Sequence, residues 1–167
     1  MTAIPFDVND AKLRESFLSQ VMFEAIAKLT EDTQPLWGNM TPQQMIEHLF
    51  WAFQCSTGTV NLPCYTPASV LERAKRFLYD NRHTPHELKN PAIGESLPSL
   101  QFSTLTKARA ALQKEVVHFF EHFRAVPEAT HVHPIFGPLG AEEWQRSHFK
   151  HCYHHLSQFG TIDERGM

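Results

Sequence analysis

The amino-acid sequence predicts an all-α protein, a four-helix bundle with one extra short helix and long loops. Four long segments repeat apolar residues at the three- and four-residue spacing of an amphipathic helix, and strand patterns are weak throughout. The segments between them are rich in prolines and glycines, which end helices and form connections. Because helices of this kind bury their apolar stripes against one another, a bundle is the expected architecture. We expect residues 1–167 to form a single domain.

The second helix has the clearest beginning in the sequence. Thr41 is suited to the N-cap, Pro42 to the first helical position, and Gln44 completes a capping box. Apolar residues at helical spacing carry this helix to about Cys55. A connection over 30–40 separates it from a first helix that we expect from Asp10 to Leu29.

Later in the chain, helices alternate with long connections. In order, we expect a short helix over 68–79, a long loop over 81–99, a helix from Ser103 or Thr104 to Phe123, a connection over 125–140 and a last helix from Ala141 to about Phe159. Gly160 is the expected end of that helix. The 81–99 loop carries three prolines and a glycine, so we expect it to wrap the surface or border a site.

Composition narrows the classes of partner. The formal net charge is -3 and no basic run could neutralise a row of phosphates, so we expect neither nucleic acid nor a membrane as a partner. No window approaches the roughly 18 apolar residues of a membrane span, and no signal peptide is recognisable. The three cysteines (Cys55, Cys64 and Cys152) form no disulfide framework, which favours the cytoplasm.

Histidines are the unusual feature of the sequence. There are eleven, and four of them fall within residues 148–155. At about 100° per residue, His151 and His155 lie one turn apart on the same stripe, at the edge of the apolar face, where two imidazoles can converge on one ion. His148 leans toward the core as a second-shell or alternative ligand. His154 lies opposite the apolar face and is expected to be solvated.

A third histidine has a matching place on the second helix. His48 lies at the boundary of its apolar face, with Gln44 one turn before it, whereas the neighbouring Glu47 turns away. Since the inner edges of two bundle helices can face each other across a polar cavity, His48 is predicted to join His151 and His155. Three imidazoles with an open fourth position are typical of a catalytic metal site, and they suit zinc, nickel, iron or copper.

Other histidines are weaker candidates. His118 and His122 are also four apart, but the pair faces away from the apolar arc of its helix and is expected at the surface. His131 and His133 lie in the 125–140 connection, where they could border a pocket.

The cysteines and tryptophans are expected mainly to have packing roles. Cys55 and Cys152 occupy apolar or boundary positions, as small buried thiols often do, although one of them could lie near the metal. Trp37 and Trp144 are expected to be packing residues. The sequence contains no phosphate-binding glycine loop, nucleophile elbow, CxxC pair or HExxH motif.

Two stretches carry a resemblance to a known family. Residues 35–49 read PLWGNMTPQQMIEHL, and residues 133–160 read HPIFGPLGAEEWQRSHFKHCYHHLSQFG. Together they resemble the DinB/YfiT-like metalloenzyme superfamily, most closely an uncharacterised bacterial branch with HPxFG and HHLxQFG signatures. The resemblance implies a four-helix bundle that binds a metal through His48, His151 and His155. It also implies a homodimer, and relatives that are thiol-dependent transferases, isomerases or hydrolases.

Three functions remain open from the sequence. The first is a metal-dependent enzyme, a hydrolase or thiol-dependent transferase that activates water or a thiol for a small-molecule substrate. Its second-shell or proton-transfer candidates are Gln44, His131, His133 and His148. The second is a non-catalytic metal-binding or stress-response protein with a structural metal. The third is a helical interaction module with incidental histidines.

Overall fold

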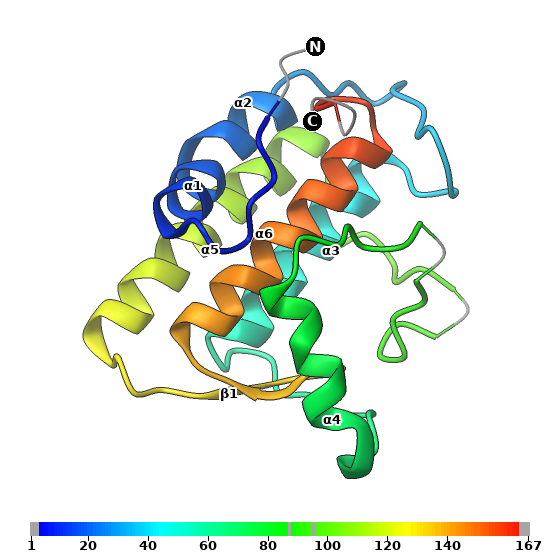
Figure 1. Ribbon diagram of the computed structural model, residues 1–167. Coiled ribbons are helices and arrows are strands. Elements are labelled where there is room, and N and C mark those ends of the chain that lie inside the picture. Colours follow the sequence, from blue (N-terminus) through cyan, green and yellow to red (C-terminus); the bar gives the residue numbers. More distant parts are fainter. Residues whose placement is uncertain (1–3, 87, 95, 164–167) are drawn as a thin grey trace.

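Helices make up about half of the chain and dominate the fold, as expected (Figure 1). The computed structural model describes residues 4–86, 88–94 and 96–163. Its elements are α1 (Ala11–Ser16), the π-helical turn η1 (Phe17–Val21), α2 (Met22–Ile26), α3 (Pro42–Ser56), α4 (Ala68–Lys75), the 3-10 turn η2 (Arg76–Tyr79), α5 (Leu105–Ala125), β1 (His131–His133), β2 (Gly137–Leu139) and α6 (Ala141–Gln158).

The first helical segment is less regular than its sequence pattern indicates. We expected one helix over 10–29, but a π-helical turn separates α1 from α2. The wider turn places the adjacent side chains of Phe17 and Leu18 both in the core, where each is fully buried. Asp10 begins the segment as an N-cap, accepting a hydrogen bond from the backbone N–H of Leu13 at 3.0 Å.

Helix α3 begins as its sequence predicts. The Thr41 hydroxyl accepts from the backbone N–H of Gln44 at 3.2 Å, and the Gln44 side-chain oxygen accepts from the backbone N–H of Thr41 at 2.8 Å. Both donors would otherwise lack partners at a helix start, so this capping box sets the position of every later side chain on α3, including His48.

The expectation of an all-α fold is wrong between α5 and α6. Within the expected 125–140 connection, β1 and β2 form an antiparallel hairpin in which His131 pairs with Leu139 and His133 with Gly137. Strands of three residues are too short to show an alternating pattern, and the side chain of His133 helps to make the turn by accepting backbone N–H groups within it. The hairpin therefore escaped detection by periodicity.

Helix α6 is enclosed by the rest of the molecule. It packs against α1, α2, α3, η2 and β2, and Figure 1 shows it running through the middle of the fold. Polar residues on α6 are consequently buried together with apolar ones, among them Arg146, Lys150 and His155. An apolar cluster from Ile4 to Ile162 forms the core around it. Nowhere in the described ranges is a helix long and apolar enough to cross a membrane.

The capping box predicts a measurable loss on truncation. Replacing Thr41 with Ala removes a side-chain acceptor at the start of α3, so the free energy of unfolding should fall by about 1 kcal/mol. Urea denaturation would measure this change. The matched control is Thr130→Ala, at an exposed residue outside any helix, which should leave the midpoint almost unchanged. An equal effect of both substitutions would contradict the capping role.

Candidate metal centre

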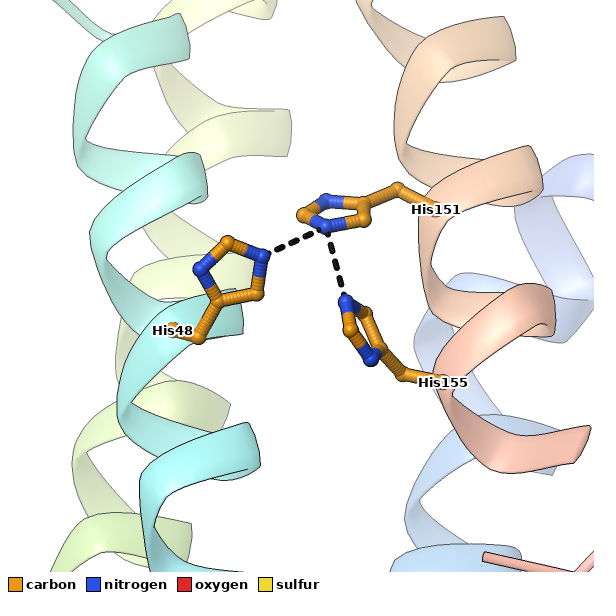
Figure 2. A group of neighbouring side chains, drawn as sticks. All are labelled: His48, His151 and His155. Atoms are coloured by element: carbon orange, nitrogen blue, oxygen red, sulfur yellow. Dashed lines mark hydrogen bonds between the residues drawn. The ribbon is translucent and has the colours of Figure 1, made fainter. Parts of the chain in front are cut away.

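Three histidines from two helices converge on one point (Figure 2). His48 projects from α3, and His151 and His155 project from successive turns of α6. The Nε2 atom of His151 lies 2.8 Å from Nε2 of His48 and 3.1 Å from Nε2 of His155. The structure thus brings together the three residues that the sequence singled out.

These imidazoles are electrically neutral near pH 7. Withdrawal from water lowers the pKa of His48 to about 4 and holds the pKa of both His151 and His155 well below the usual value. The neighbouring rings lower these pKa values further, since a second positive charge nearby would be repelled. Neutral imidazole is the form that binds a metal ion.

The spacing of the nitrogens suits a metal ion. Ligand nitrogens about 2.0–2.1 Å from a tetrahedral ion lie about 3.3 Å apart, and those of His48, His151 and His155 all lie within 4.8 Å of one another. A set of neutral nitrogens whose lone pairs meet at one point is stabilised by a cation. The donor set therefore fits a divalent transition ion.

Gln158 orients one of these rings and was not identified from the sequence. Its side-chain oxygen accepts from Nδ1–H of His155 at 2.8 Å, and its amide nitrogen donates to the carbonyl oxygen of Trp37 at 2.9 Å. A carbonyl only accepts, so the second bond determines which way the amide points. The proton of His155 is thus held on Nδ1, and its Nε2 lone pair faces the other two histidines.

Gly38 makes room for this amide. A Cβ atom at this position would lie 2.7 Å from the amide nitrogen of Gln158, and its backbone has a φ of +74°, which favours glycine. Two signals pointed to Gln158 in advance: it lies three residues after His155, near the end of α6, and it is the glutamine of the HHLxQFG signature. Its partner at Trp37 is distant in the sequence.

The three histidines open onto a cavity of about 500 Å³. Much of its other wall comes from the loop before α5, which contributes Thr84, Leu88, Lys89, Asn90, Ile93, Gly94 and Leu97. Of the two roles expected for this loop, wrapping the surface or bordering a site, its residues line the cavity beside the three histidines. A second cavity of about 550 Å³ shares His48, Ile93 and Leu97 with the first. A molecule of moderate size can therefore lie beside the imidazoles.

His133 lines the first cavity as a hydrogen-bond donor. Its Nδ1 atom accepts from the backbone N–H groups of Ile135 at 3.0 Å and Phe136 at 3.2 Å, so its proton resides on Nε2. Desolvation lowers its pKa to about 3, which keeps the ring neutral. His133 is therefore suited to donate a hydrogen bond from Nε2 and unsuited to accept a proton.

Two of the remaining catalytic candidates, His148 and Gln44, lie in different surroundings. His148 is fully buried and stacks on Phe53 with ring centres 3.7 Å apart. Its Nε2 atom has no hydrogen-bond partner among the described residues, and the ring lines a small cavity of about 30 Å³ next to His133 and His151. The side-chain oxygen of Gln44 is occupied by the capping box, although Gln44 borders the second cavity.

Two residues of α6 are less exposed than expected for a helix with one solvated face. His154 was expected to be solvated, but it is half-buried, lies near the ring of Trp37 and lines the first cavity. Lys150, which was not identified as a site residue, is buried in the same cavity wall. Its ammonium donates to the carbonyl oxygens of Phe77 and Arg82, and burial lowers its pKa to about 8. Both differences arise because other segments cover every side of α6.

The cysteines take the packing positions that were expected for them. Cys55 and Cys152 are both buried, and burial raises the pKa of Cys55 to about 12 and that of Cys152 well above its usual value. Protonated thiols are poor metal ligands, so the histidine set stands without them. Glu47 is turned away, as expected, and accepts from the backbone N–H groups of Gln101 and Phe102.

Removal of the Gln158 acceptor should weaken metal binding. In Gln158→Leu the His155 ring loses the group that holds its proton on Nδ1, so zinc affinity should fall by about 10- to 100-fold. Competition with a chromophoric chelator measures this affinity. Gln158→Glu keeps an acceptor for Nδ1–H but loses the donor to Trp37, so it should bind zinc more weakly than the wild type and more tightly than Gln158→Leu. Gln113→Leu, at an exposed residue on α5, should have no effect. Unchanged affinity in Gln158→Leu would contradict the orienting role.

Buried neutral histidines predict acid sensitivity of the metal-free protein. His133 has a pKa of about 3 in the folded protein and about 6.5 when unfolded, so below pH 6.5 only the unfolded chain takes up the proton. The free energy of unfolding should therefore fall as the pH decreases from about 6.5 toward about 4, with up to about 1.4 kcal/mol per pH unit for this residue. Urea denaturation at several pH values measures the slope. His133→Gln should reduce it, whereas Gln113→Leu, at an exposed residue that does not titrate, should not.

Comparison with known proteins assigns the chain to a family. No curated protein matches the chain. The family model described as "Protein of unknown function (DUF1569)" matches residues 9–161, a range that includes α1 to α6 and all three converging histidines. The chain therefore belongs to the DUF1569 family.

Proposed function

We propose that the protein binds one divalent transition metal ion through His48, His151 and His155 and uses it as an enzyme on a small-molecule substrate. One observation carries this proposal. Three neutral imidazole nitrogens meet at the wall of a cavity of about 500 Å³, which leaves space beside them for a reacting molecule.

The chemistry follows from this donor set. A divalent ion with an open coordination position lowers the pKa of a bound water or thiol toward neutrality and so supplies a nucleophile. Gln158 holds His155 in the tautomer that binds, and the α6 backbone holds His151 one turn away. His133 donates from Nε2 to negative charge that develops on a substrate oxygen in the cavity.

Zinc or nickel is the expected ion, and iron or copper also suits imidazole ligands. A hydrolase and a thiol-dependent transferase would use the same open position, so the metal site is common to both reactions. The resemblance to the DinB/YfiT-like superfamily, which includes both, supports this pair of reaction classes. On the same resemblance we infer a four-helix-bundle framework and a homodimer. The three free cysteines support a reducing cytoplasm.

A non-catalytic protein with a structural metal is the alternative, and its metal would have a fourth ligand from the protein. Among the described residues, no fourth histidine, cysteine or acidic side chain joins the group formed by these three histidines. The cavity beside them favours an open position over a closed one. The catalytic function is therefore the better supported of the two.

Metal analysis tests the proposal directly. Protein purified without a histidine tag should contain near-stoichiometric metal by plasma mass spectrometry, and His151→Ala and His155→Ala should each lose it. Gln113→Ala, at an exposed residue on α5 outside the site, should retain it. Absence of metal from the wild type, even after reconstitution, would reject the site and leave the helical interaction module as the remaining hypothesis.

Turnover then separates the reaction classes. If the protein is a hydrolase, the metal-loaded wild type should cleave esters or amides without a thiol. If it is a thiol-dependent transferase, it should turn over a substrate only when a low-molecular-weight thiol is present. His151→Ala should be inactive in both assays. X-ray absorption at the bound metal provides a second measurement. Three nitrogen ligands and an exchangeable oxygen support the enzyme, whereas four protein ligands would favour the structural alternative.

A further inference from the structure

A second group of histidines lies outside the proposed metal centre. His118 and His122 occupy successive turns of the last half of α5, and His131 begins β1. In Figure 1, α5 leads through a connection into β1 at one end of the molecule. None of these side chains lines the cavities beside His48. The proposed function therefore leaves them without a role.

Two of these rings face each other as the converging rings of the first site do. The Nε2 atoms of His122 and His131 are 2.8 Å apart, the same separation as between His48 and His151. At this distance at most one of the two nitrogens carries a proton, and the other presents its lone pair. Partial burial and the neighbouring His122 also lower the pKa of His131, which favours its neutral form.

The position of His131 is determined by the backbone around it. A Cβ atom on Gly58 would lie 2.6 Å from Cε1 and 2.7 Å from Nδ1 of this ring, so only glycine permits the contact. The carbonyl oxygen of His131 accepts from the indole N–H of Trp144 at 3.2 Å, which anchors the start of β1 to α6. One edge of the ring thus rests on Gly58 while Nε2 faces His122.

His118, one turn before His122 on α5, is the candidate source of a third nitrogen for this pair. Its ring centre is 6.2 Å from that of His122, compared with 4.8 Å between His151 and His155. Because His118 is exposed, a rotation of its side chain can close this difference. Its Nδ1 is hydrogen-bonded to the carboxylate of Glu115 at 3.0 Å, which leaves the Nε2 lone pair available, as in carboxylate–histidine–metal sites.

We propose that His122 and His131, completed by His118, form a second site for a divalent transition metal ion. The ligands are imidazoles, so the ion is of the zinc, nickel or copper class. The site is partly exposed to solvent, so water completes its coordination and the ion exchanges readily. It is independent of the proposed enzyme function, because it shares no residue with the first site.

Zinc titration of the metal-free protein against a chromophoric chelator tests this second site. The wild type should bind two equivalents, and the double variant His122→Gln/His131→Gln should bind one. His151→Ala/His155→Ala should also bind one, with the weaker affinity of the exposed site. Glu121→Gln, at an exposed residue on the same helix, should bind two. A double variant at 122 and 131 that still binds as many equivalents as the wild type would overturn the proposal.

A measurement on the wild type alone keeps the test independent of variant folding. In ¹⁵N-correlated NMR spectra of the histidine rings, the Nε2 signals of His122 and His131 should move with the second equivalent of zinc. Signals that stay unchanged at zinc saturation would show a hydrogen-bonded pair and no metal site. The titration also distinguishes failure of the first site. If that site binds no metal, His151→Ala/His155→Ala should bind as many equivalents of zinc as the wild type.

Discussion

The enclosure of α6 is the constraint on which the structure depends. A helix covered on every side must place its polar side chains beside partners, because an unpaired polar group away from water costs free energy. Arg146 donates to the carbonyl oxygen of Val8, and Lys150 donates to the carbonyl oxygen of Phe77. These bonds hold the amino-terminal segment and η2 against the helix. The packing of distant segments is therefore determined by the polar residues of α6 as well as by its apolar ones.

The three converging histidines follow from the same constraint. His155 obtains a partner for Nδ1 from Gln158, but the Nε2 atoms of His48, His151 and His155 meet only one another. Three neutral rings around one point satisfy their lone pairs best when a cation is present. These three imidazoles, one buried and two half-buried, are thus prepared for a metal ion, and the cavity beside them leaves room for a further molecule.

Equal spacing in the sequence leads to unequal sites. Two histidines four residues apart occur on both α5 and α6, yet the α6 pair lies in a covered cavity wall whereas His118 on α5 is exposed. Burial keeps the α6 rings neutral and holds their orientation through Gln158. On α5, burial does not fix the histidine rings. Contacts with residues from elsewhere in the chain do so instead, because His131 faces His122 and rests on Gly58. The segments that pack over each helix, and not the spacing of its histidines, therefore distinguish the rigid first site from the proposed second site, whose ion exchanges.

Local rules determined much of this protein from sequence alone. The capping box at Thr41, the end of α6 at Gly160 and the pairing of His151 with His155 depend on residues within one or two turns, which the sequence displays directly. Only the tertiary structure decided which distant segments cover each face. The hairpin, the half-buried His154 and the role of Gln158, whose second partner is Trp37, all depend on that coverage. Periodicity records which face of a helix is apolar, but burial depends on what packs there.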